Sequence, residues 1–330
     1  MKKQSFWLVV SVMILVFPWI VKSPRWLTTA NLMFYYIILA ISWNLIMGYT
    51  GLFSFAHVAF AGIGGYGSSL LSIYLNIPPA LGIIIGGGVA AFLGLLLGAL
   101  CLRLRGFYLC LVTWAFAVII GTLACTEYKY TGGTGGLTAP TLFRSMSGVP
   151  YYYVGLVITV IMLYSTFRLI NSRIGLYLRS IREDEDAAEV MGIDTVKWKI
   201  FSFVLSSFWA GIAGGFYAHY LGLIDPSIVG LDEMGKVIMM VVIGGIGTLA
   251  GPLVGAIFVV FISEFIRGTI AIFGILAFSV IIILTMRFAR GGLMGAVRYL
   301  YPQVVRINKK IFANYGHKNN FATKYKKWAK

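Results

Sequence analysis

The sequence predicts an all-α, polytopic integral membrane protein with about ten transmembrane helices, some of them interrupted by glycine-rich segments. Of the 330 residues, 59% are hydrophobic and only 12% are charged, and the mean hydropathy is +0.87, which is far more apolar than a soluble domain of this length. Apolar runs close to the length of about 20 residues that a bilayer crossing needs recur along the chain. The formal net charge of +16 comes from Lys and Arg that gather between alternate runs.

Ten apolar runs follow one another with short polar connections. They occupy approximately residues 6–21, 31–47, 55–75, 80–100, 107–124, 151–170, 201–221, 236–246, 251–266 and 269–286. The first run has the basic start of a signal peptide, but no small-x-small cleavage site precedes the next run, so we expect it to be retained. The eighth and ninth runs are short. We count them as two crossings because a single crossing would place the basic C-terminal tail outside the cell.

The distribution of Lys and Arg predicts the orientation. With the N-terminus inside, the cytoplasmic segments carry 21 of these residues and the external segments carry 6, the excess that cytoplasmic loops normally show. We therefore expect ten crossings within a transmembrane domain of residues 1–290, with both termini cytoplasmic. The basic tail, residues 291–330, mixes Lys with aromatic residues; this favours contact with anionic lipid over RNA, and no nucleic-acid partner is expected.

Two glycine-rich stretches break the apolar pattern, "MGYTGLFSFAHVAFAGIGGYG" (residues 47–67) and "VIGGIGTLAGPLVGA" (residues 242–256). Glycine at this density serves close helix packing, and it also permits unwound backbone at membrane depth where protein encloses that backbone. The polar residues and the proline that cluster there favour a transport pathway. The residues predicted to line it are Ser54, His57, Thr113 and Trp114.

Three other patterns indicate alternative activities. Ser54 and His57, at helical i, i+3 spacing, raise the alternative of an intramembrane Ser/His hydrolase, but a nucleophile-elbow pattern and a third residue are missing. Glu264 is the candidate acid of an ion-coupled carrier, or it pairs with Arg267 one turn away. The stretch from Gly230 to Lys236 matches G-x-x-x-x-G-K, but Val237 stands where Ser or Thr must bind magnesium, so we expect no ATP site on this chain.

The cysteines give no sign of a metal site. Cys101, Cys110 and Cys125 lie in or beside apolar runs, without a CxxC or His-paired spacing. We therefore interpret them as buried thiols and expect neither a bound metal nor a disulfide. No cofactor is expected on this chain.

One polar segment, "RSIREDEDAAEVMGIDTVKWK" (residues 179–199), holds six of the 11 acidic residues and lies in the predicted cytoplasmic loop 171–200. Ser180 and Glu183 form an S-x-x-E capping box, so we expect a helix to begin at Ile181 and to stop at Gly192. A helix of this length is marginal alone in water. We expect the helix 181–191 to lie in a groove of a partner protein. The alternative is contact with its own bundle or with lipid headgroups.

The segment "IREDEDAAEVMGID" is similar to the cytoplasmic coupling segment of the LivM-type permeases of bacterial branched-chain amino-acid ABC transporters. Four further stretches resemble the same family, and together they run in order from about residue 31 to residue 290. They are "NLIMGYTGLFSFAHVAFAGIGGYGSSLL" (residues 44–71), "LRLRGFYLCLVTWAFA" (residues 102–117), "TGGTGGL" (residues 131–137) and "VVIGGIGTLAGPLVGA" (residues 241–256).

The resemblance implies a non-enzymatic permease subunit of an ATP-driven importer for leucine, isoleucine and valine in the bacterial plasma (inner) membrane. The implied partners are a second permease of LivH type, two cytosolic ABC ATPase subunits that use the ATP, an extracytoplasmic solute-binding protein and membrane lipid. The implied ATPase-coupling residues are Glu183, Ala187, Ala188, Met191 and Gly192. The run "FSFA" (residues 53–56) departs from the family pattern and the tail is longer than usual, so urea or short-amide permeases of the same family stay open as alternatives.

Overall fold

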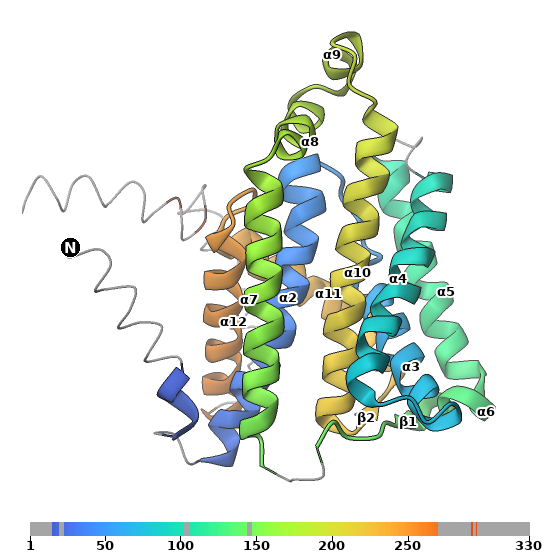
Figure 1. The fold of residues 1–330 in the computed structure, drawn as a ribbon, viewed down its shortest axis with the longest axis vertical. Coiled ribbons are helices and arrows are strands. Elements are labelled where there is room, and N and C mark those ends of the chain that lie inside the picture. Colours follow the sequence, from blue (N-terminus) through green and yellow to red (C-terminus); the bar gives the residue numbers. More distant parts are fainter. Residues whose placement is uncertain are drawn as a thin grey trace, which may run out of the picture.

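The computed structural model describes residues 15–19, 23–101, 106–143 and 147–269, together with positions 292 and 295. Within these ranges the fold is helical apart from one short two-stranded ribbon (Figure 1). The elements are α2 (Pro24–Thr50), α3 (His57–Tyr74), α4 (Pro79–Cys101), α5 (Phe107–Thr126), α6 (Tyr128–Thr131), η1 (Gly133–Gly135), β1 (Leu137–Thr138), α7 (Val149–Ile170), α8 (Arg173–Glu183), α9 (Glu185–Val190), α10 (Thr195–Leu221), β2 (Leu223–Ile224), η2 (Pro226–Val229), α11 (Leu231–Gly244) and α12 (Ala250–Thr269). The predicted first run, tenth run and basic tail lie largely outside the described residues.

The apolar runs predicted between residues 31 and 266 each coincide with a helix. These helices are α2, α3, α4, α5, α7, α10, α11 and α12. Five of them, α2, α4, α5, α7 and α10, are long and apolar enough to cross a membrane by length and composition. The protein is therefore an all-α, multi-pass membrane protein, whereas the count of ten crossings stays a prediction.

Helices α2 and α10 form the interior of the bundle. Burial within the chain covers 72% of the apolar stretch of α2 and 67% of that of α10, against 22% for α5 and 28% for α7. A helix that is apolar on all sides is normally buried or faces lipid. The outer helices α5 and α7 thus present apolar surface to the outside of the bundle, whereas α2 and α10 pack against each other and are enclosed by α3, α4, α7, α11 and α12.

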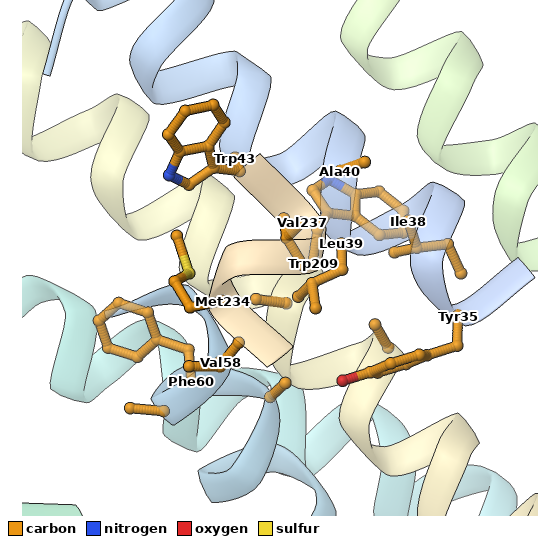
Figure 2. Close-up of a cluster of buried hydrophobic side chains, with 14 of the residues drawn as sticks. Tyr35, Ile38, Leu39, Ala40, Trp43, Val58, Phe60, Trp209, Met234 and Val237 are labelled. Carbon is orange, nitrogen blue, oxygen red and sulfur yellow. The ribbon is translucent and has the colours of Figure 1, made fainter. Parts of the chain in front are cut away.

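The core joins side chains from four helices (Figure 2). Tyr35 and Trp43 of α2, Phe60 of α3, Trp209 of α10 and Met234 of α11 all lie in one buried cluster. Trp43 and Phe60 are fully buried. Because the large rings come from helices that are distant in sequence, this cluster fixes how α2, α3, α10 and α11 pack together.

Helices α3 and α10 approach one another at glycines. A Cβ atom added to Gly64 would lie 2.1 Å from the carbonyl oxygen of Gly211, and one added to Gly214 would lie 1.8 Å from that of Ala61. No side chain can stand between two backbones this close, and such small-residue contacts are typical of packing within membranes. The seam between α3 and α10 therefore requires glycine on both helices.

The two ends of the bundle differ. Figure 1 shows α8 and α9 projecting beyond one end, while α6, β1 and β2 lie at the other. The ribbon pairs Leu137 with Ile224. His219 Nδ1 donates to the carbonyl oxygen of Pro140 at 2.6 Å, and His219 Nε2 accepts from Ser68 Oγ at 2.5 Å. At this end of the bundle, His219 therefore joins α10 to α3 and to the segment that contains Pro140.

Helices α11 and α12 form an antiparallel hairpin along α2. A Cβ added to Gly244 would meet Gly251, and one added to Gly255 would meet Met240, so the two helices run in opposite directions. Arg25 Nε pairs with Glu264 Oε1 at 2.6 Å near the start of α2. The predicted pairing of Glu264 with Arg267 stays a prediction, because the side chain of Arg267 lies outside the described residues.

We expect Gly214→Ala to destabilise the fold, because its methyl group would overlap the Ala61 backbone and overpacking costs ~1–3 kcal/mol. The matched control is Gly88→Ala on α4, where an added Cβ meets no atom within 4 Å. The measurement is the apparent midpoint of thermal unfolding in detergent. A lower midpoint for Gly214→Ala alone is expected, and equal midpoints would contradict the close seam.

Candidate functional site

The first helix break, residues 51–56, lies beside the last turns of α2. Helix α2 ends where Gly51 adopts a φ of +78°, a left-handed conformation that favours glycine. The chain then turns back along α2: the amide of Leu52 donates to the carbonyl oxygen of Ile46 at 3.3 Å, and Trp43 Nε1 donates to the carbonyl oxygen of Ser54 at 2.8 Å. Non-helical backbone therefore lies within the helix layer, as the glycine-rich stretch predicted.

Side chains satisfy the backbone of this break. The amide of Phe55 donates to Thr113 Oγ1 at 3.1 Å, and Cys110 Sγ lies 3.5 Å from the carbonyl oxygen of Phe53. Ser54 Oγ accepts from the backbone amide two residues later at 3.2 Å. An unpaired backbone group in hydrocarbon costs several kcal/mol. Thr113 and Ser54, two predicted pathway residues, therefore hold the break in place.

His57 does not form the dyad with Ser54 that the spacing suggested. Its Nε2 lies 2.5 Å from Ser206 Oγ, and that hydroxyl donates its one proton to the carbonyl oxygen of Ser42 at 2.7 Å. The His57 Nε2–H therefore donates to Ser206. The imidazole ties the start of α3 to α10 and α2, and its pairing with Ser206 takes the place of the Ser54 contact that the hydrolase hypothesis requires.

An apolar groove of about 330 Å³ lies between the first break, α5, η2 and the start of α11. Trp114, a predicted pathway residue, is 44% exposed and lines it, whereas Ser54, His57 and Thr113 are buried behind its wall. Sequence reasoning missed Phe55, which points to the groove from the break; two aromatic residues in "FSFA" were the available signal. The other lining residues are Val58, Ala117, Val118, Gly121, Thr122, Cys125, Pro226, Val229, Gly230, Leu231 and Met234.

The cysteines are more accessible than expected. Cys125 is exposed at the groove and Cys110 is half-buried, so the interpretation of buried thiols is wrong for these two, because α5 lies at the outside of the bundle and the described residues cover little of it. The side chain of Cys101 lies outside the described part. Among the described residues, no group of three His, Cys, Asp or Glu side chains is placed to hold a metal ion.

The second break, residues 245–249, separates α11 from α12. Gly245 and Gly247 adopt φ values of +118° and +76°, and the side chain of Asn44 holds the turn. Asn44 Oδ1 accepts from the amide of Gly247, and Asn44 Nδ2 donates to the carbonyl oxygen of Thr248, both at 2.9 Å. The buried side-chain amide of Asn44 and the hydroxyl of Thr248, which donates to the carbonyl oxygen of Gly245, together satisfy this break. The second glycine-rich stretch therefore also encodes an interruption.

The projecting loop contains two helices, α8 and α9, where the sequence predicted one helix from Ile181 to Met191. Ser180 does not cap: its hydroxyl donates to the carbonyl oxygen of Leu176 inside α8. The N-cap of α9 is Asp184, whose Oδ1 accepts from the amide of Ala187 at 3.0 Å. The capping-box prediction is wrong because helix α8 already includes Ser180, and the carboxylate of Asp184 starts the next helix.

The end of α9 agrees with the prediction. The helix stops at Val190, and Gly192 adopts a φ of +83° that terminates it. This left-handed residue turns the chain towards α10.

One face of α9 is fixed to the start of α10. The buried Nζ of Lys199 pairs with Glu185 Oε1, and Thr195 Oγ1 donates to Glu189 Oε1 at 2.6 Å. Ala188 is buried beside these contacts. The short helix is therefore held by an ion pair, a hydrogen bond and an apolar contact.

The opposite face of α9 is open. Val190 and Met191 are 87% and 81% exposed, and α9 forms the far tip of the protein (Figure 1). Of the predicted coupling residues, Glu183, Ala187, Met191 and Gly192 lie at this exposed end, whereas Ala188 is buried. We call Ala187, Val190 and Met191 the apolar tip. Large apolar side chains this exposed commonly mark a contact surface.

The chain matches one protein family over most of its length. The profile of the family described as "Branched-chain amino acid transport system / permease component" matches residues 26–289. This range includes both breaks, the groove and the apolar tip. No solved structure matches the chain.

Several curated proteins are similar. The chain is 30% identical over 294 residues to the high-affinity branched-chain amino acid transport system permease protein LivM of Escherichia coli, which covers 81% of this chain and 69% of that protein. It is 26% identical to the probable LivM permease of Methanocaldococcus jannaschii, over 67% and 75% of the two chains. It is 24% identical to the high-affinity branched-chain amino acid transport system permease protein LivH of Escherichia coli, over 67% of this chain and 78% of that protein.

We expect Thr113→Val to destabilise the first break, because the buried amide of Phe55 would lose its acceptor at a cost of ~1–3 kcal/mol. The matched control is Thr122→Val on the same helix, at the exposed wall of the groove. The measurement is the rate at which a thiol reagent labels Cys110, whose sulfur contacts the same break. Faster labelling in Thr113→Val than in Thr122→Val supports the assignment, and equal rates count against it.

Proposed function

The chain belongs to the family of branched-chain amino acid transport system permease components, and on this premise we propose that it is the LivM-type membrane subunit of an ATP-driven importer for leucine, isoleucine and valine. The observation that carries the proposal is the match over residues 26–289, because it covers the groove and the apolar tip in one chain. The protein is a transport permease; the hydrolysis of ATP falls to its partners.

In this proposal the apolar tip docks into a cytosolic ABC ATPase. The exposed side chains of Val190 and Met191 enter a groove of the ATPase, in the manner of a short helix in a recognition groove. Lys199 and Glu185 hold α9 against α10. Any movement of the docked tip is therefore applied to α10, one of the two central helices.

The groove beside Trp114 and Phe55 forms one wall of the solute pathway in this proposal, and a second permease of LivH type supplies the opposite wall. Its lining is apolar, which suits the aliphatic side chain of a branched-chain amino acid. Thr113, Ser54 and His57 lie behind the wall and keep the first break in shape.

The proposed assembly sits in the bacterial inner membrane, with ten crossings of this chain and both termini in the cytoplasm. The six Lys and Arg between residues 168 and 199 lie at the end of the bundle that carries α8 and α9, which supports a cytoplasmic position for that end. Two ATPases bind there, the extracytoplasmic binding protein approaches the end with α6 and the ribbon, and the basic tail lies on anionic lipid.

Two alternatives remain distinct hypotheses. A urea or short-amide permease would use the same fold. This alternative rests on residues 53–56, which depart from the family pattern and include Phe55, a residue that lines the groove. An ion-coupled carrier would need an acid that exchanges its ion during transport, but Glu264 pairs with Arg25, which favours a structural role for this carboxylate.

The substrate is tested with the complete transporter and its binding protein in lipid vesicles. We expect ATP-dependent uptake of radiolabelled leucine, isoleucine and valine and no uptake of urea or acetamide. Uptake of urea or acetamide without uptake of the three amino acids would contradict the proposed substrates and favour the amide permease. Uptake driven by an ion gradient in the absence of ATP would contradict the importer itself.

We expect Met191→Asp to separate the permease from its ATPase, because a carboxylate would be desolvated in an apolar contact where central residues contribute ~2 kcal/mol or more. The amount of ATPase that co-purifies with the permease should fall by about tenfold or more. The matched control is Leu176→Asp, an exposed leucine on α8. Ala188→Arg should instead lower thermal stability, since the side chain of Ala188 is buried. Normal co-purification of the Met191→Asp variant would contradict docking through the tip.

A further inference from the structure

We propose that Arg182 is a positioning residue that makes the projecting loop and both helix breaks move as one unit. The inference rests on the proposed function, in which the apolar tip receives the movement of the ATPase. It concerns a different step, the transfer of that movement from the loop to the backbone that borders the groove.

Arg182 is the penultimate residue of α8, and its side chain reaches the end of α2. Its Nη1 donates to the carbonyl oxygen of Gly48. The last carbonyl groups of a helix lack partners within the helix, and a positive charge is favourable at this negative end of the helix dipole. Arg182 therefore caps α2 immediately before the first break begins at Gly51.

The same side chain passes between the two breaks. A Cβ atom added to Gly51 in the first break would lie 3.2 Å from Arg182 Cγ, and one added to Gly247 in the second break would lie 2.6 Å from Arg182 Nη1. Glycine at both positions thus leaves the space that the arginine fills. One side chain contacts two interruptions that are almost 200 residues apart in sequence.

The second break is also joined to α2 through Asn44, whose amide holds Gly247 and Thr248. Arg182 and Asn44 together connect α8, the end of α2 and the turn between α11 and α12. Arg179, on the same helix, lies over the ring of Tyr49 at 5.7 Å from its centroid. The contacts form a continuous physical network, which is the means by which displacement passes between sites.

The consequence for transport is mechanical. Residues 51–56 continue from the capped end of α2 and place Phe55 on the groove. A shift of α8 that carries Arg182 therefore acts on the groove wall through the first break and on α11 and α12 through the second. Without the guanidinium, the tip can still bind an ATPase, but its movement is no longer imposed on both breaks.

The test compares Arg182→Gln, Arg182→Lys and the matched control Arg173→Gln, a like change at the opposite, exposed end of α8. In the reconstituted transporter, we expect Arg182→Gln to keep normal ATPase co-purification and ATP hydrolysis, while solute imported per ATP falls by about tenfold, equivalent to ~1.4 kcal/mol of coupling. Arg182→Lys, which keeps one charged donor, should recover part of this ratio. An unchanged ratio in Arg182→Gln would overturn the proposal.

A second measurement, of the distance between α8 and the second break, tests directly whether Arg182 links them. Spin labels at Leu176 on α8 and Ile246 in the second break, both exposed, are introduced into a chain whose native cysteines are replaced. With Arg182 present, we expect the same narrow distance distribution in the nucleotide-free and ATP-trapped transporter. With Arg182→Gln, the distribution should broaden and differ between the two states. Identical distributions in both proteins would refute the linkage.

The two failures are distinguishable. If the apolar tip does not bind an ATPase, the Met191→Asp variant co-purifies normally and the proposed function fails. If the tip binds an ATPase but Arg182 does not transmit its movement, co-purification falls in Met191→Asp. The ratio of solute to ATP and the spin-label distances are then unchanged in Arg182→Gln.

Discussion

The structure depends on one constraint, the cost of leaving backbone amide and carbonyl groups unpaired where water is absent. Side chains of neighbouring helices satisfy much of the backbone of both breaks: Trp43 and Thr113 bind the first, and Asn44 binds the second. Each of these side chains is buried, so the interrupted backbone is enclosed and kept from lipid. The position of α5 and of the α11–α12 hairpin follows from these hydrogen bonds.

The projecting loop shows a different use of polar contacts. A buried ion pair seldom adds much stability, because the desolvation of both charges offsets their attraction, but its geometry specifies position. Lys199 forms such a pair with Glu185, the first residue of α9. The exposed Val190 and Met191 are thereby presented in a fixed direction, and a helix of six residues gains an orientation that its own sequence does not give it.

The sequence predicted the helices and their interruptions because hydrophobic length and glycine clustering are local signals. It also located the loop and the end of its second helix at Gly192. Contacts between residues far apart in the sequence gave no such local signal: His57 binds Ser206, and Glu264 binds Arg25. The capping box failed for a local reason, since Ser180 fits the pattern but already lies within α8. Arg182 carried no signal, because only the fold brings it to Gly48.

The groove has a chemical consequence of its own. None of its lining residues is charged. In the proposed transporter this wall would therefore offer no counterion to the ammonium and carboxylate of a zwitterion, which would keep their hydration or find partners on the facing subunit. The wall contributes only the modest affinity of aliphatic contact, and a shallow energy well implies a brief dwell time. Such a surface would favour throughput over discrimination in the proposed transporter, and the choice among solutes would then fall to an earlier encounter outside the bilayer.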